Sequence, residues 1–331
     1  MSGGDRSRWC YTTWSGGGVR ASALVGAYCE LVARGLLGER GAAAHSGSSG
    51  GGVPAAALAL GYAPSDVADM LIALDFERFR PAPPPTLRAA LTALSTALGA
   101  GAAAGYNDGA EVARWLGDMV AASPLGDGDA GTTFAQLERR RRERGYPMPP
   151  DAQVPCLTLS GVRVTRRRGA RLVYFAGGDM PIRDALRITI SVPAYFAAPL
   201  HRGAPHVDGA LLDNCPVRPF LGAPARRTVA LVLGGDDEDV DEADIVTAEP
   251  DDPPLSAREM ASAVARATSG DELTRVRVAA ARAAGVDVVR VDAGTDVSFL
   301  DLSVTRASRA MLVLRGSAAA AHWLDKGGRN T

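Results

Sequence analysis

"GAAAHSGSSGGGVPAAALAL", residues 41–60, is the stretch that decides the fold. The alanine run with His45 and Ser46 predicts a short buried strand, and the apolar run after Gly51 predicts a helix. Pro54 falls in the first turn of that helix, where its missing N–H costs no hydrogen bond. The glycines and serines between the two elements predict a tight turn, so the stretch is a strand–turn–helix unit.

A second unit of this kind precedes it. "RWCYTTW", residues 8–14, predicts a buried strand, "SGGGVRAS", residues 15–22, a glycine-rich turn, and the following residues a helix that ends at Gly35. Two such units in succession indicate an α/β fold with a largely parallel sheet. Further strands are predicted within residues 154–164, 171–177, 205–208, 227–235 and 286–292, of which the first two could pair as a hairpin. Residues 180–196 predict a helix that stops near Pro193.

The rest of the chain suggests one domain over residues 9–325. Residues 62–146 are helical in pattern and low in complexity, and we expect a helical cap or insertion there. Residues 236–254 are acidic and contain prolines, which predicts a loop, and a last helix is expected near residues 303–325. The termini, residues 1–8 and 326–331, are expected to be flexible.

Composition and charge argue against several classes of protein. A net charge of -1 over 331 residues argues against nucleic acid binding, and 47% hydrophobic residues suffice for a large core. No transmembrane span or signal peptide is visible, and the four cysteines have no zinc spacing. We therefore expect a cytoplasmic protein with reduced cysteines, no metal and no cofactor. The single lysine, Lys326, among 36 basic residues reflects a compositional bias that favours arginine.

Ser49 is the serine that fits a chemical motif. Gly47 and Gly51 flank it in the pattern G-x-S-x-G, whereas Ser48 has Ser46 two residues before it. In that pattern the serine hydroxyl is exposed at a sharp strand-to-helix turn, beside the positive end of the helix dipole. The pattern alone is equally consistent with a flexible turn.

The other glycine-rich turn, residues 16–18, exposes consecutive N–H groups at a helix start and predicts an anion or oxyanion site. A nucleotide site is the alternative. It is disfavoured because no Gly-Lys-Ser/Thr is present and Ala21 stands where a dinucleotide motif needs glycine. Asp208 in "HVDGALLDNCPV" follows a short strand and precedes Gly209; by itself it would be interpreted as a turn residue.

Together, the glycine loop, the Ser49 turn and the Asp208-Gly209-Ala210 triplet resemble the patatin-like phospholipase family in content and order. The resemblance spans roughly residues 9–325 and implies a three-layer α/β/α fold with a central, largely parallel sheet. It implies that Ser49 is the nucleophile and Asp208 its base. It also implies an oxyanion hole formed by Gly16, Gly17 and Gly18, a role for the basic Arg20, and supporting positions at Gly47, Gly51, Gly209 and Ala210.

By this resemblance the reaction is release of a fatty acid from a phospholipid or related lipid ester through an acyl-enzyme. The implied partner is the lipid, with transient contact to a membrane surface through residues 86–146 or the basic turn near Arg166. The basic runs at residues 137–145 and 164–172 are equally consistent with solvated surface. Ala21 and Cys215 depart from the family pattern, where a glycine and an asparagine are usual.

Two other functions remain open. The chain could be an inactive scaffold of the same family, used for binding. It could also be an esterase with a Ser–Asp–His triad, since Ser49, Asp208 and His322 occur in that order. We expect His322 to be dispensable because it lies in a C-terminal helical pattern, and His45 to pack beneath the turn. An aspartate base further predicts no titration of activity near pH ~6.5, the ordinary histidine value.

Overall fold

The structure is a computed structural model that describes residues 9–38, 40–80, 107–165, 169–193, 195–234 and 271–328. The acidic segment 236–254, the N-terminal residues 1–8, residues 86–105 of the predicted helical cap and the basic turn at Arg166 lie outside the described residues. The predicted domain limits stay predictions.

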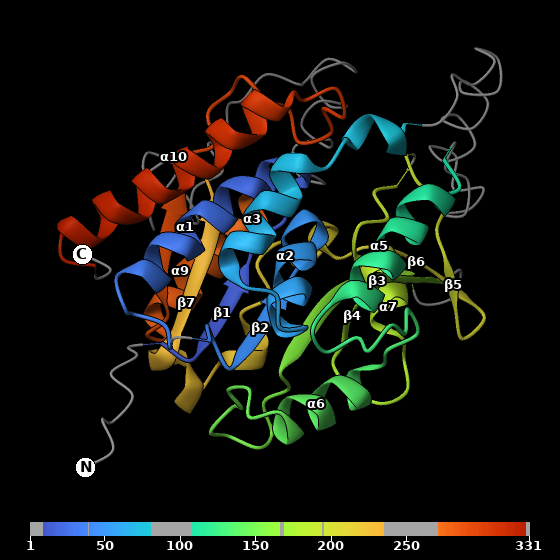
Figure 1. The fold of residues 1–331 in the computed structure, drawn as a ribbon, viewed down its shortest axis with the longest axis horizontal. Helices are drawn as coiled ribbons and strands as arrows, with labels where there is room; N and C mark the ends of the chain where they lie inside the picture. The colour runs from blue at the N-terminus through green and yellow to red at the C-terminus, as the bar shows by residue number, and fades with distance from the viewer. Residues whose placement is uncertain are drawn as a thin grey trace, which may run out of the picture.

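A mostly parallel sheet forms the centre of the molecule (Figure 1). Its strand order is β5-β6-β3-β2-β1-β7-β8. Strands β3, β2, β1, β7 and β8 run parallel, while β4 and β6 both pair antiparallel with β3, and β5 pairs antiparallel with β6. The strands are β1 Tyr11–Trp14, β2 Ala44–Gly47, β3 Leu157–Thr165, β4 Gly169–Phe175, β5 Leu200–His201, β6 Ala204–Asp208, β7 Thr228–Leu233 and β8 Asp287–Val291.

Helices cover both faces of this sheet. They are α1 Ala21–Ala33, α2 Ser49–Ala59, α3 Pro64–Ala73, α5 Ala110–Ala122, α6 Phe134–Glu143, α7 Ile182–Thr189, α9 Asp271–Ala283 and α10 Arg306–Asp325. Short 3-10 turns lie at Gly18–Arg20, Phe76–Phe79, Gly209–Leu211, Arg218–Phe220 and Ala223–Arg227. Helix α7 ends at Thr189, so the predicted continuation of this helix to Pro193 is wrong.

The alternation of side chains along β7 shows how the layers form. Val229 and Leu231 pack into the large core shared with α1 and α10, whereas Ala230 and Val232 pack on the other face against Val278 of α9. Successive side chains of a strand point to opposite faces, so a strand that is apolar throughout must be covered on both sides. The result is the predicted three-layer α/β/α fold, with α1 and α10 side by side on one face (Figure 1).

The described helices of residues 62–146 belong to the same large core. Leu71 of α3, Leu116 of α5 and Leu137 of α6 are all buried in it. None of the described helices is both long and apolar enough to cross a membrane.

Strand register brings three loops to one edge of the sheet. Trp14 at the end of β1 pairs with Gly47 at the end of β2, so the glycine loop and the Ser49 turn leave the sheet side by side. Strand β6 runs toward this region from the opposite direction and ends at Asp208, which pairs with Gly161 of β3. Carboxyl ends of parallel strands are where α/β folds place their sites.

Candidate active site

Ser49 is the first residue of α2, and its backbone has a positive φ of 50°. Such a conformation is rare for a residue with a side chain and marks a strained strand-to-helix turn. Its neighbour Ser48 is fully buried and extended, and its hydroxyl accepts a hydrogen bond of 2.8 Å from Ser160. Ser49 is 7% exposed and lines the cavities at the carboxyl edge, so it is the serine open to a substrate.

Asp208 lies within hydrogen-bond distance of Ser49. The Ser49 hydroxyl donates to Oδ2 of Asp208 at 2.7 Å, and the N–H of Ala210 donates to Oδ1 at 2.8 Å. The N–H of Asp208 is held by the carbonyl of Ser191 at 2.9 Å. These contacts fix both oxygens of the carboxylate and direct one of them at the Ser49 proton.

Burial changes the acidity of this carboxyl group. Loss of solvation raises the pKa of Asp208 to about 7, against the lowering effect of the hydrogen bonds from Ser49 and Ala210. A carboxylate with a pKa near neutrality is a stronger base than an exposed one, which suits proton abstraction from a hydroxyl. This raised pKa changes the expectation for the pH dependence: with Asp208 as the base, we expect activity to titrate near neutral pH.

The N–H groups of the glycine loop differ in whether they are hydrogen-bonded within the protein. The N–H of Gly16 donates to the carbonyl of Asn214 at 2.9 Å, so the prediction of Gly16 as an oxyanion donor is corrected. Within the described residues, the N–H groups of Gly17 and Gly18 have no hydrogen-bond partner, and both residues line a cavity with Ser49. Unpaired N–H groups beside a hydroxyl are able to bind a negatively charged oxygen.

The two glycine turns pack directly on each other. A Cβ atom at Gly50 would lie 2.4 Å from the carbonyl oxygen of Gly18, a distance that no side chain permits. A Cβ atom at Gly209 would lie 2.1 Å from the hydroxyl of Ser160, so the residue after Asp208 must also be glycine. Glycine at these positions lets the turns and β6 approach closely enough to assemble the site. Gly47 ends β2 and Gly51 lies in the first turn of α2.

Two cavities meet at Ser49. The apolar channel is lined by α3, α5 and the aromatic residues near them, including Leu74, Phe79, Val112, Trp115 and Phe196. The polar cavity is lined by Gly17, Arg20, Asp208 and Asn214 among others. Gly18, Ser49, Val192, Phe299 and Leu300 line both. Ser49 therefore has an apolar environment on one side and a polar one on the other.

Arg20 is the cation of the polar cavity. Its Nε atom is buried and has no hydrogen-bond partner within the described residues. A guanidinium that lines a cavity and has an unpartnered Nε atom suits an anionic group of a ligand.

No histidine contacts Ser49 or Asp208 in the part of the chain that the structure describes. His322 is exposed near the end of α10, and the ring of its neighbour Trp323 packs at a tilt against that of Trp9, with a centroid distance of 5.9 Å. Trp9 precedes β1, so His322 lies toward the amino end of the parallel strands, opposite Ser49. His45 is buried within β2 and bonded to Thr12, and burial lowers its pKa to about 3.

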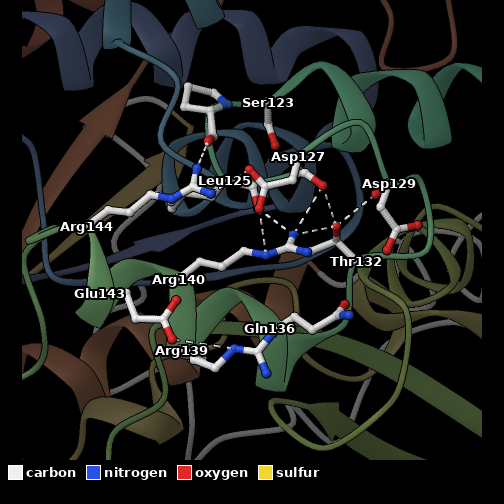
Figure 2. Close-up of polar contacts among 12 residues, drawn as sticks. Ser123, Leu125, Asp127, Asp129, Thr132, Gln136, Arg139, Arg140, Glu143 and Arg144 are labelled. Carbon is white, nitrogen blue, oxygen red and sulfur yellow. Dashed lines mark hydrogen bonds and ion pairs between the residues drawn. The ribbon is translucent and has the colours of Figure 1, made fainter.

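Most arginines in the basic run of α6 pair with carboxylates or donate to carbonyl groups of the protein itself (Figure 2). Arg140 and Arg144 pair with Asp127 at 3.0 and 2.6 Å, and Arg139 pairs with Glu143 at 3.8 Å. Arg141 is 1% exposed and donates to backbone carbonyls. Most of this positive charge is therefore neutralised or internal, which favours the interpretation of residues 137–145 as ordinary structure rather than a lipid contact.

The departures from the family pattern are accommodated. Cys215 is fully buried, and its sulfur lies 3.9 Å from the hydroxyl of Thr13 on β1. Ala21 begins α1 and lines the apolar channel. The described cysteines are all free, and no group of histidine, cysteine or acidic residues suited to a metal ion occurs in the described ranges.

Several residues of the site carried no signal in the sequence. The hydroxyl of Thr189 accepts the N–H of Ser49 at 3.0 Å, and Ser191 holds Asp208 as described above. The carbonyl of Phe299 accepts the N–H of Val19 at 3.1 Å and so braces the glycine loop from the segment after β8. The contacts of Thr189 and Phe299 join residues 140 or more positions apart, and no local pattern predicts them.

Comparisons with known proteins bear on the family and the fold. A family model described as "Patatin-like phospholipase" matches residues 13–221. The crystal structure of VipD from Legionella pneumophila is similar with a TM-score of 0.56 and 15% identity, over 96% of this chain and 67% of VipD. The structure of ExoU with SpcU, from the type III secretion system of Pseudomonas aeruginosa, matches with a TM-score of 0.47 and 18% identity, over 98% of this chain and 54% of the other. A search of the curated proteins found no match.

Proposed function

The chain belongs to the patatin-like phospholipase family, which indicates lipase activity in general, and we propose that it hydrolyses fatty-acyl esters of phospholipids or related lipids. The observation that carries this proposal is the 2.7 Å hydrogen bond from Ser49 to Asp208, beside the unpaired N–H groups of Gly17 and Gly18. A nucleophile, a base and oxyanion donors then converge where the two cavities meet.

The proposed reaction has two halves. Asp208 takes the proton of Ser49 as its Oγ attacks the ester carbonyl, and the negative charge on the carbonyl oxygen is stabilised by the N–H groups of Gly17 and Gly18. The protonated Asp208 then gives its proton to the leaving alcohol, and an acyl-enzyme remains on Ser49. Water, deprotonated by Asp208, hydrolyses this ester, releases the fatty acid and returns the proton to Ser49.

The cavities suggest the direction in which the substrate binds. The leaving alcohol must lie near Asp208 to receive the proton, and Asp208 lines the polar cavity. The acyl chain then occupies the apolar channel, where Phe79, Val112 and Trp115 would bury its methylene groups. Arg20 in the polar cavity suits the phosphate of a phospholipid head group.

Hydrolysis of a lipid panel tests this function. The panel contains diacylphospholipids, lysophospholipids, triacylglycerols and nitrophenyl esters of several chain lengths, with fatty acid release as the measurement. We expect release by the parent and by Ser48→Ala, and none by Ser49→Ala. Equal release by folded Ser49→Ala would refute the proposal. A fluorophosphonate probe that labels Ser49 while every lipid is left intact would favour the scaffold or a different ester.

A further inference from the structure

A hollow separate from Ser49 lies beside the β5–β6 hairpin. Arg163 of β3, Tyr174 and Phe175 of β4, Met180, and the hairpin residues His201, Arg202 and His206 line it, and we call it the hairpin pocket. Its described lining contains two arginines and two histidines but no carboxylate. Neither Arg163 nor Arg202 has an ion-pair partner within the described ranges. The potential in this pocket is therefore positive.

His206 supplies a polar atom inside the hairpin pocket. The residue is 3% exposed, and its Nδ1 lies 2.9 Å from the carbonyl of Ala204, which can only accept a hydrogen bond. Nδ1 is therefore the protonated nitrogen of the neutral ring, and Nε2 has no partner in the described part of the chain. The ring centroids of His201 and Phe175 lie 5.6 and 6.0 Å from the centroid of the His206 ring.

The charges around His206 couple its protonation to an anion. Burial lowers its pKa, the hydrogen bond to Ala204 raises it, and the positive charges of His201 and Arg163 lower it further. A negative group in the hairpin pocket would offset both the burial and these charges. An anion and a proton on His206 should therefore bind together.

The hairpin pocket lies at the same edge of the sheet as the active site. Gly47 at the end of β2 pairs with Leu159, and β3 continues to the pair of Arg163 with His206. At about 3.3 Å per residue, that pair lies ~13 Å beyond the end of β2, in the direction in which Ser49 leaves the sheet. Leu200 on β5 is 71% exposed beside the pocket, the most exposed large hydrophobic residue among those described.

We propose that the β5–β6 hairpin and its pocket dock on a membrane of anionic phospholipid, with a lipid phosphate bound by Arg163, Arg202 and His206 and with Leu200 in the interface. An exposed leucine beside unpaired cations matches a surface that is apolar below and negatively charged above. The shared edge would place the mouth of the active site toward the lipid. This inference goes beyond the proposed hydrolysis and does not depend on it.

Flotation with vesicles tests the docking in the Ser49→Ala background, so that the lipid is not consumed. Vesicles of phosphatidylcholine are compared with vesicles that also contain phosphatidylglycerol. We expect salt-sensitive binding to the anionic vesicles alone, reduced about tenfold or more in the double variant Arg163→Gln/Arg202→Gln. Binding unchanged in that variant, or no binding to anionic vesicles by the folded chain, overturns the proposal.

Matched controls locate the contact. Arg142 is exposed on α6 without an ion pair in the described ranges, so Arg142→Gln removes a comparable charge elsewhere and should change binding less than about twofold. Leu200→Ala should weaken binding, whereas Met311→Ala, at a residue 49% exposed on α10, should not. Loss of binding in Arg142→Gln or Met311→Ala equal to that in the hairpin variants overturns the assignment.

Two further measurements identify the anion. Binding to anionic vesicles should strengthen from about pH 8 to pH 5.5, and His206→Asn should flatten this dependence while the thermal midpoint stays close to the parent. In the second, inorganic phosphate is added without vesicles. Thermal stabilisation by phosphate that requires Arg163 and His206, combined with no vesicle binding, would assign the pocket to a soluble phosphate and overturn the membrane proposal.

Discussion

Ser160 on β3 donates a hydrogen bond of 2.8 Å to the hydroxyl of Ser48, and this bond holds Ser48 inside the protein. With Ser48 fixed to the sheet, the positive φ of Ser49 turns the next hydroxyl toward Asp208. Two adjacent serines thus have opposite roles, one anchoring the turn and the other facing the cavities.

The first prediction separates these two serines. Ser49→Ala should abolish turnover and fluorophosphonate labelling, because no other described hydroxyl contacts Asp208. Ser48→Ala removes a buried hydrogen bond and should cost about 1 kcal/mol of unfolding free energy while most activity remains. Turnover and denaturant unfolding measure the two effects. An adduct mapped to Ser48 by mass spectrometry would contradict the assignment.

The second prediction concerns the pH dependence of the reaction. Asp208 must be ionised to accept a proton, and burial raises its pKa to about 7. The value of kcat/KM should therefore rise with pH through about 7 and level off above it. Asp208→Asn should lose nearly all turnover and leave no such rise. A profile flat from pH 5 to 9 (on the order of four decades in proton concentration) would show that Asp208 is not the base.

The third prediction concerns stability at the same residue. The folded state binds the Asp208 proton more tightly than the unfolded state, so its stabilising contribution is full below the unfolded pKa of ~3.9 and is lost as pH rises through about 7. Asp208→Asn should therefore be more stable than the parent at pH 8, on the order of 1 to 4 kcal/mol, and about equal to it near pH 4. Thermal melts at both pH values provide the measurement.

The fourth prediction addresses the histidine alternative. His322→Ala should keep most of the parental turnover, because His322 is exposed near the end of α10 and lies toward the opposite end of the strands from Ser49. A pH profile cannot make this distinction, since an ordinary histidine and the buried Asp208 both titrate near neutrality. A folded His322→Ala variant as inactive as Ser49→Ala would establish the triad instead.

The fifth prediction tests the donors of the glycine loop. Replacement of the Gly18 amide by an ester removes the N–H without adding a side chain, which matters because a Cβ atom there would lie 1.8 Å from the carbonyl of Phe299. Loss of one oxyanion donor should lower kcat by about 10²–10³. The same replacement at Gly16, whose N–H is bonded to Asn214, is the control and should act mainly on stability. Equal losses of kcat in both proteins would contradict the assignment.

Local sequence patterns predicted much of the fold and the candidate nucleophile. The strand–glycine–helix units around residues 8–35 and 41–60, and the phase of Gly47 and Gly51 around Ser49, depend on backbone geometry that neighbouring residues determine. The strands β3 and β4 were likewise predicted as a hairpin and pair antiparallel. The end of α7 was not predicted. Its last residue, Thr189, accepts the N–H of Ser49, and Ser191 just beyond the helix accepts the N–H of Asp208, and a helical pattern contains no sign of these tertiary contacts.

The sequence by itself determined that glycine-rich turns follow two successive strands and that Ser49, not Ser48, has the spacing of a nucleophile. Only the tertiary structure decided which groups reach that serine, because their contacts depend on strand order and register. The pairing of β6 with β3 places Asp208 2.7 Å from Ser49 and buries it. The N–H of Gly16 is bonded to Asn214, so the N–H groups of Gly17 and Gly18 are the candidate oxyanion donors of the loop. The tertiary structure also places His322 toward the opposite end of the strands from Ser49, because chain order does not fix the edge of the sheet at which a residue lies.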